Sequence, residues 1–400
     1  MSPVQSSKPE LKAPIIAGFV ASISGSAATF GIAIAGLVAM GATRDQTFTA
    51  LFVLLIGYGL LSTVLSYRYK MPISIVWSTP GAAFLAASAG LGLEFDQAVG
   101  GFLLSGILLT VTGLWPALSK LVQKIPSSIA SAMLAGILFV FVINTVRAAV
   151  DYPFLVIPFV LVWFVLNRLA TIWATPVAIV LAFALVNADL GWDWLDSARL
   201  FPSFGIVIPA WDLLPILSIG VPLYLITMAS QNLPGIAIMK GFGYKVPVRP
   251  VITSTGIATI IASFLGGFGM NLAAITAAIN ANEQAAKDPA RRWLASFVGG
   301  LVYWLFAIGA GLFAAFVLAV PSELLLAVVG LALLPSFIAS IGASLEDRGT
   351  RLPAAITFIV GAAGISVFGI GGAFWALVAG MLVLFWERSP LIGAGRASKK

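Results

Sequence analysis

Long apolar runs, separated by short polar connections, fill almost the whole chain. Most of these runs show no amphipathic period, as is typical of helices that are bathed in lipid or buried in a bundle. At about 20 residues for each crossing of the hydrocarbon core, the pattern predicts a membrane protein with fourteen transmembrane segments. We expect these spans at 13–41, 47–67, 73–90, 97–117, 127–147, 152–168, 174–189, 213–238, 250–266, 265–283, 293–319, 322–343, 353–369 and 371–387.

The charged residues lie in the connections and follow the positive-inside rule. With the N-terminus inside and every span crossing, 19 of the 22 Lys and Arg residues fall on the cytoplasmic side. Only Arg44, Arg147 and Arg199 fall outside. This bias predicts a multi-pass protein of a bacterial-type cytoplasmic (inner) membrane, with both termini in the cytoplasm. The first apolar run is too long for the core of a cleavable signal peptide.

Composition narrows the class of protein further. Hydrophobic residues make up 60% of the 400 residues and charged residues 9%, whereas soluble domains average about 25% charged. An ordinary soluble enzyme and a disordered chain are therefore excluded. The net charge of +7 is explained by the cytoplasmic loops, so we expect the lipid bilayer and no nucleic acid as a partner. With no Cys and no His, neither a thiol nucleophile nor a Cys/His metal site is expected, and no cofactor is predicted.

The longest outer loop, at about 190–212, divides the chain into two halves of seven spans each. An odd number of spans makes the second half enter the membrane from the opposite side, so a repeat between the halves must be inverted. The third span of each half is irregular, which is the evidence for such a repeat. We therefore predict an all-α fold with a 7+7 inverted repeat, in which spans three and ten each consist of a short strand and a half-helix.

Span three combines an extended segment with a helix start. Residues 73–77 (ISIVW) are β-branched and aromatic, which favours an extended conformation. Ser78, Thr79 and Pro80 follow, and a hydroxyl before proline is a helix-start signal. A helix from 79 to 90 is about 18 Å long and too short to cross, so it should begin near the midplane of the membrane.

Span ten has the same plan. Residues 265–270 are glycine-rich, Asn271 is a good N-cap, and a helix is expected over 271–282. In an inverted arrangement the two half-helices point their N-termini toward each other, and their free N–H groups form an anion site without a basic side chain. The two extended segments can pair with each other, which satisfies their backbone. The alternative is that both spans are merely kinked helices.

Three consecutive polar residues, Ser230, Gln231 and Asn232, occur deep in span eight. They line a polar cavity or, alternatively, form hydrogen bonds between helices. The small residues of span one, including Ser24, serve helix packing or contact a ligand. No Asp, Glu, Lys or Arg is expected in the middle of a span, which argues against a membrane-embedded enzyme and against a carboxylate proton relay.

At these segments the chain resembles the benzoate/proton symporter family (BenE type). The stretches that carry the resemblance are PISIVWSTPGAA (72–83), ITMASQNLPGIAIMKGFGY (226–244) and GGFGMNLAAITAAI (266–279). The family is similar in fold to uracil permeases and sulfate-type anion transporters. The resemblance implies a core domain (13–117 and 213–319) and a gate domain (127–189 and 322–388), and it leaves a homodimer open.

The resemblance also implies a substrate site between spans three and ten, beside spans one and eight. Where uracil permeases have acidic and His residues on span eight and a Glu on span ten, this chain has Ser230, Gln231, Asn232 and Asn271. Uncharged residues suit an anionic substrate, and they leave the proton carrier unassigned unless the proton travels on the substrate carboxyl. The candidate substrate-binding residues are Ser24, Trp77, Ser78, Thr79, Gly81, Ser230, Gln231, Asn232, Phe268, Gly269, Met270, Asn271 and Leu272.

We therefore expect a secondary active transporter, not an enzyme, that imports a small aromatic carboxylate such as benzoate, coupled to protons by alternating access. Backbone N–H groups near Gly81 and Leu272 would bind the carboxylate, and Trp77, Phe30, Phe268 and Met270 are the candidates for the apolar walls. The alternatives are a nucleobase permease for uracil or xanthine-like substrates, another organic-anion transporter of the same fold, and an anion channel.

Overall fold

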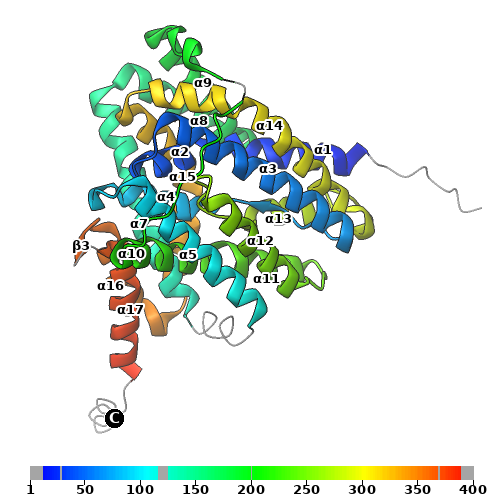
Figure 1. Ribbon diagram of the computed structural model, residues 1–400, viewed down its shortest axis with the longest axis vertical. Coiled ribbons are helices and arrows are strands. Elements are labelled where there is room, and N and C mark those ends of the chain that lie inside the picture. The colour runs from blue at the N-terminus through cyan, green and yellow to red at the C-terminus, as the bar shows by residue number, and fades with distance from the viewer. Residues whose placement is uncertain (1–11, 28, 116–124, 200, 368–369, 389–400) are drawn as a thin grey trace, which may run out of the picture.

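Helices dominate the computed structural model, which describes residues 12–27, 29–115, 125–199, 201–367 and 370–388 (Figure 1). Within these residues, six helical segments are long and apolar enough to cross a membrane. They are α3 (Arg44–Tyr69), α5 (Phe95–Leu114), α7 (Ser127–Asp151), the continuous segment Leu213–Gly241, the segment Pro289–Ala319 that contains α14 (Trp293–Ala319), and α15 (Ser322–Leu345). The chain is thus a multi-pass membrane protein.

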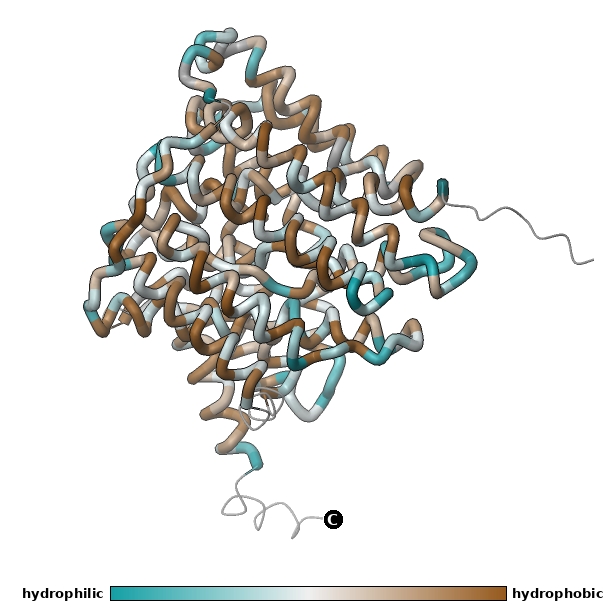
Figure 2. The backbone as a smooth tube through the Cα atoms, turned by 45° about the vertical axis from the view of Figure 1, so that its right-hand side comes forward, coloured by the Kyte–Doolittle hydropathy of each residue, from teal (hydrophilic) through white to brown (hydrophobic). Residues whose placement is uncertain are grey.

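Shorter apolar helices fill most of the remaining predicted spans. They are α1 (Lys12–Ala27), α2 (Phe30–Ala39), α8 (Pro153–Leu169), α9 (Thr171–Leu190), α12 (Val248–Ser263), α16 (Arg351–Ala362) and α17 (Gly372–Arg388). Hydrophilic residues gather at helix ends and in the connections (Figure 2). The helices fall close to the predicted ranges, and the count of fourteen crossings stays a prediction, because the shorter helices do not fix it.

Two predicted ranges need correction. The run 13–41 was expected to be one span, but it contains two helices, α1 and α2, and Thr29 N–H bonds to the carbonyl of Ser26 at the junction. The run 353–369 is helical only to Ala362, and a short antiparallel hairpin of β3 (Ser366–Val367) and β4 (Ile370–Gly371) follows. An apolar pattern without a period does not distinguish a helix from such a hairpin.

The two irregular spans meet in the centre of the structure, as predicted. Strand β1 (Ile75–Val76) leads into the half-helix α4 (Thr79–Ala87), and β2 (Asn271–Leu272) leads into the half-helix α13 (Ala274–Ala281). The strands pair antiparallel, with Ile75 opposite Leu272 and Val76 opposite Asn271. The kinked-helix alternative is therefore wrong for both spans.

Hydroxyl groups of neighbouring helices satisfy the extended backbone, which water cannot reach. On α3, Ser62 Oγ accepts a hydrogen bond from Ile75 N–H at 2.8 Å, and Ser66 Oγ donates to the carbonyl of Ile73 at 2.8 Å. On α12, Thr259 Oγ1 accepts from Met270 N–H at 2.9 Å. Gly269 has φ of +151°, which side chains rarely adopt. The glycine-rich run thus permits the path of the chain into β2.

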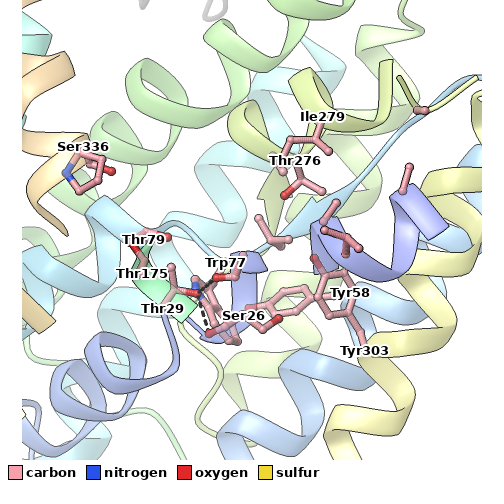
Figure 3. A pocket seen from close by; sticks show the side chains of 18 of the residues that line it. Ser26, Thr29, Tyr58, Trp77, Thr79, Thr175, Thr276, Ile279, Tyr303 and Ser336 are labelled. Atoms are coloured by element: carbon pink, nitrogen blue, oxygen red, sulfur yellow. Dashed lines mark hydrogen bonds between the residues drawn. The ribbon is translucent and has the colours of Figure 1, made fainter. Parts of the chain in front are cut away.

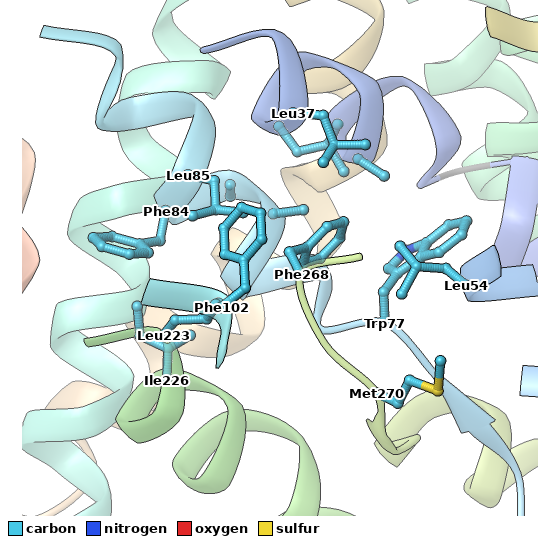
Figure 4. Close-up of a cluster of buried hydrophobic side chains, with 14 of the residues drawn as sticks. Leu37, Leu54, Trp77, Phe84, Leu85, Phe102, Leu223, Ile226, Phe268 and Met270 are labelled. Atoms are coloured by element: carbon cyan, nitrogen blue, oxygen red, sulfur yellow. The ribbon is translucent and has the colours of Figure 1, made fainter. Parts of the chain in front are cut away.

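Small residues let the helices around this centre approach closely. At the contact between α3 and α14, a Cβ on Gly300 would lie 2.8 Å from the carbonyl oxygen of Gly59. The aromatic ring of Phe268 packs against Phe102 of α5, with ring centroids 6.3 Å apart (Figure 4). The paired strands and half-helices are therefore fixed from several sides by a packed core.

Candidate functional site

A cavity of about 650 Å³ lies where α4 and α13 begin (Figure 3). Helices far apart in the sequence contribute to its wall, including α1, α3, α9, α14 and α15. Its polar lining is provided by Ser26, Thr29, Tyr58, Thr79, Thr175, Gln231, Thr276, Asn282, Gln284, Tyr303 and Ser336, and its apolar lining includes Trp77, Val76, Ile279 and Leu333. No Asp, Glu, Lys or Arg of the described residues lines it.

The start of α4 is capped as predicted. Ser78 is the N-cap, and its Oγ accepts a hydrogen bond from Gly81 N–H at 3.0 Å, with Pro80 in the first turn. The Gly81 amide is therefore occupied, and the expectation that it is open to a ligand is wrong. Thr79 lines the cavity, and helix geometry leaves its N–H without an intrahelical partner.

The start of α13 differs from the prediction. Asn271 is not the N-cap but part of β2, and the helix begins at Ala274 with Ala273 as N-cap. The side chain of Asn271 is fully buried and donates to the carbonyl of Leu272 at 3.1 Å. The pairing of β2 with β1 prevents the helix from starting there. Three residues are thus extended or capping where a helix was expected.

The backbone before α13 is held by span eight. Asn232 Oδ1 accepts from Leu272 N–H at 2.9 Å, and Gln231 Oε1 accepts from Ala274 N–H at 3.3 Å. The Leu272 amide is therefore not open to a ligand, contrary to expectation. Helix geometry leaves the N–H groups of Ile275 and Thr276, in the first turn of α13, without intrahelical partners.

A π-helical turn, Met228–Asn232, places the polar residues of span eight between α10 (Leu213–Thr227) and α11 (Leu233–Gly241). Such turns are rare and occur frequently at functional sites. Of the three predicted polar residues, Gln231 lines the cavity. Asn232 is fully buried, and Ser230 Oγ donates to the carbonyl of Ile226 in its own helix at 2.6 Å.

Aromatic side chains form one wall of the cavity (Figure 3). The ring centroid of Tyr58 lies 5.5 Å from that of Trp77 and 6.1 Å from that of Tyr303. The Tyr58 hydroxyl donates to the carbonyl of Gly269 at 3.2 Å, so the ring is fixed against the strand segment. Edge-to-face pairs of this kind hold rings in place and leave their faces available for contact.

The other candidate wall residues do not line the cavity. Phe268 and Met270 are 1% and 2% exposed and belong to the buried hydrophobic core, where Figure 4 draws them with Trp77. Phe30 packs edge-to-face on Trp77, with centroids 5.2 Å apart. In the paired strand segments, Val76, Trp77 and Ala273 line the cavity, whereas Phe268 and Met270 do not.

Three of the candidate binding residues, Trp77, Thr79 and Gln231, line the cavity. The side chain of Ser24 in α1 lies outside the described part of the structure. The remaining candidates surround the cavity without lining it: Ser78, Gly81, Ser230, Asn232, Phe268, Gly269, Met270, Asn271 and Leu272.

Sequence reasoning missed the lining residues Tyr58, Tyr303, Thr276 and Ser336. The first two lie within long apolar runs that show no polar face. Thr276 follows the observed cap residue Ala273 by three positions and so shares its helix face, but the sequence predicts the cap at Asn271 and therefore gives no such signal. Within the described residues, no cluster of three or more Asp or Glu side chains could hold a metal ion.

Comparisons with a family model and with known sequences place the chain in one protein family. The model of the family BenE, "Benzoate membrane transport protein", matches residues 9–386. Inner membrane protein YdcO of Escherichia coli is 34% identical over 369 residues, which cover 92% of this chain and 93% of that protein. The benzoate membrane transport protein of Acinetobacter baylyi is 29% identical over 379 residues, covering 94% of this chain and 95% of that protein.

Solved structures share the fold at low sequence identity. The transmembrane domain of a cyanobacterial bicarbonate transporter, BicA, aligns with a TM-score of 0.62 at 16% identity, covering 93% of this chain and 98% of that one. The murine anion transporter Slc26a9 in the inward-facing state aligns with a TM-score of 0.60 at 12% identity, covering 97% of this chain and 74% of that one. This likeness concerns the fold alone.

Proposed function

Because the chain belongs to the BenE family of benzoate membrane transport proteins, we propose that it is a secondary active transporter that imports benzoate or a similar small aromatic carboxylate. The observation that carries the proposal is the cavity, which joins the first turns of two half-helices to an aromatic wall. A carboxylate needs hydrogen-bond donors and a benzene ring needs apolar surface, and the cavity offers both side by side. Its volume falls within the range of about 300–1,000 Å³ that is typical of small-molecule sites.

The carboxylate binds at the first turns of α4 and α13. Its oxygens accept hydrogen bonds from the N–H groups of Thr79, Ile275 and Thr276, supported by the positive ends of the two helix dipoles. The Gln231 side-chain NH₂ donates a further hydrogen bond, because the Oε1 of this amide is already paired with Ala274 N–H. No acidic side chain among the described lining residues opposes the bound charge.

The ring of the substrate lies against Tyr58, Trp77 and Tyr303. Contacts with aromatic faces and edges contribute both buried apolar area and ring-specific geometry. A neutral nucleobase carries no charge for the positive ends of the two helix dipoles to stabilise. The cavity therefore suits an aromatic acid better than uracil.

Transport follows from a 7+7 inverted repeat of fourteen spans, in which a core domain (13–117 and 213–319) moves against a gate domain (127–189 and 322–388). The lining supports this division, because Thr79 and Gln231 lie on the core side and Thr175 and Ser336 on the gate side. Ala13 and Gln284, near the predicted cytoplasmic ends of their spans, also line the cavity. This supports a conformation open to the cytoplasm, with both termini on that side.

Uptake into proteoliposomes tests the proposal. Radiolabelled benzoate and uracil are offered with and without an inward proton gradient, and protein-free liposomes correct for passive permeation of benzoic acid. We expect saturable benzoate uptake that the gradient accelerates, with the proton carried by the substrate carboxyl. Saturable uptake of uracil alone would assign the chain to the nucleobase permeases, and flux that does not saturate would indicate a channel.

A further inference from the structure

Arg292 is a buried cation without an ion-pair partner. It lies between the short turn Pro289–Arg291 and α14, and it is 4% exposed, the lowest exposure of any Asp, Glu, Lys or Arg in the described residues. The ion pairs found among these residues are Arg199–Asp45 and Arg291–Asp288, and neither includes Arg292. An unpaired buried charge is destabilising, so its presence requires compensation from its surroundings.

Backbone carbonyls at the C-terminal end of α13 provide that compensation. Arg292 Nη1 donates to the carbonyl of Ala281, the last residue of α13, at 2.7 Å. Its Nε donates to the carbonyl of Ala286 at 2.7 Å. A helix C-terminus carries about half a negative charge, and a cation in this position neutralises it.

The opposite end of α13 faces the cavity. Ala273 and Thr276 line the cavity, and so do Gln284 and Ala285, which lie between the two carbonyls that Arg292 binds. The helix has 8 residues and is therefore about 12 Å long. Arg292 thus lies one short helix away from the place where the carboxylate is proposed to bind.

We propose that Arg292 is a positioning residue that determines the charge selectivity of this cavity: it is the fixed positive charge of an anion site whose lining has none. This inference rests on the proposed function. With a hydrogen bond at each end of the helix the two charges lie about 18 Å apart, and at an effective dielectric constant of about 20 one unit charge then strengthens the binding of a monoanion about fivefold. A neutral molecule of the same shape gains nothing, so Arg292 favours carboxylates over their neutral isosteres.

Affinity measurements with two charge-removing variants and one charge-retaining variant test this role. Benzoate and its neutral isostere benzamide are titrated against the full-length protein in lipid nanodiscs by calorimetry. Arg292→Gln removes the buried charge. Arg292→Lys retains the charge but cannot reproduce the fork that spans two carbonyls. Arg291→Gln is the matched control. It removes the same charge from the neighbouring residue, which forms a partly exposed ion pair with Asp288.

We expect about fivefold weaker benzoate binding for Arg292→Gln, binding within about twofold of wild type for Arg292→Lys, and little change for Arg291→Gln. Benzamide binding is expected to stay the same in all three. Equal loss in Arg292→Gln and Arg292→Lys, or equal loss for benzoate and benzamide, would show that Arg292 only holds the fold and would overturn the inference.

Three further outcomes are distinguishable. If Arg292→Gln does not fold, Arg292→Lys decides alone, because the charge account requires it to keep the wild-type preference for benzoate over benzamide. If the wild-type protein binds no benzoate at all, the proposed function fails, and the inference falls with it. If the wild type binds benzoate and Arg292→Gln binds it equally well, only the inference fails.

Discussion

Asn232 in the π-helical turn accepts a hydrogen bond through its Oδ1 from the backbone N–H of Leu272, 40 positions further along the chain, at 2.9 Å. Both residues are fully buried. The bond occupies a strand amide that points away from β1, and it fixes span eight to the strand that leads into α13. One side chain therefore links the rare helix geometry of span eight to the placement of the half-helix at the cavity.

Asn232→Ala should destabilise the protein without removing a cavity contact. It leaves the Leu272 N–H buried and unpaired, which costs about 1–3 kcal/mol of unfolding free energy. The loss is measurable as a lower thermal unfolding temperature in detergent. Ser230→Ala is the control, because Ser230 bonds only to a carbonyl of its own helix. Equal stability of the two variants would contradict the bracing role of Asn232.

Gln231 lines the cavity, and its side chain accepts a hydrogen bond from the first N–H of α13. Gln231→Ala removes a donor to the carboxylate, so benzoate should bind about tenfold more weakly, the effect of losing one hydrogen bond to a charged group. Gln231→Glu keeps the size of the side chain but places a like charge beside the substrate, so its binding should be weaker still. Calorimetry on both variants checks this order. If Gln231→Glu bound benzoate as tightly as the wild type, the substrate carboxylate could not lie beside this residue.

Two substitutions of Tyr58 separate what its ring and its hydroxyl contribute to stability and to benzoate affinity. Tyr58→Phe loses the hydrogen bond to the carbonyl of Gly269, so the unfolding free energy should fall by about 1 kcal/mol. The ring stays in the aromatic wall, and benzoate affinity should change by less than about threefold. Tyr58→Ala should weaken both properties, because it also removes the ring contact. If Tyr58→Phe abolished binding, the hydroxyl would be a substrate ligand and the assignment of the wall would be wrong.

Gly59 lies at the crossing of α3 and α14, where a Cβ would meet the carbonyl oxygen of Gly300 at 2.7 Å and the ring of Trp304. Gly59→Ala should therefore lower the unfolding temperature by forcing the two helices apart, at a cost of about 1–3 kcal/mol. Gly241→Ala is the matched control, since nothing lies within 4 Å of its Cβ position. Equal unfolding temperatures for the two variants would contradict this packing.

Local signals in the sequence were sufficient for much of the fold. Ser78 and Pro80 define the start of α4 by themselves, because capping and the fixed φ of proline depend on neighbouring residues only. The glycines around Gly269 correctly indicate that the run is not helical, although the paired strand lies at Asn271–Leu272, just after the predicted extended segment 265–270. The range of each long helix follows from its apolar run, although such runs do not show where a helix breaks, as at Thr29.

Tertiary contacts decided what the sequence could not. Asn271 has the propensity of an N-cap, but its pairing with Val76 keeps it in a strand and moves the helix start to Ala274. Tyr58 and Tyr303 reach the cavity only because of how α3 and α14 pack, which a run without a period does not encode. Arg291 and Arg292 are adjacent and chemically identical, and only the fold makes one half-exposed and the other buried.

The most direct test of the binding mode is the position of the substrate itself, determined in a structure of the protein with 4-bromobenzoate in lipid nanodiscs. We expect the carboxylate within hydrogen-bond distance of Thr79 and Gln231, at the first turns of α4 and α13, and the brominated ring against Trp77. A carboxylate bound away from both half-helices, or a ligand outside this cavity, would contradict it.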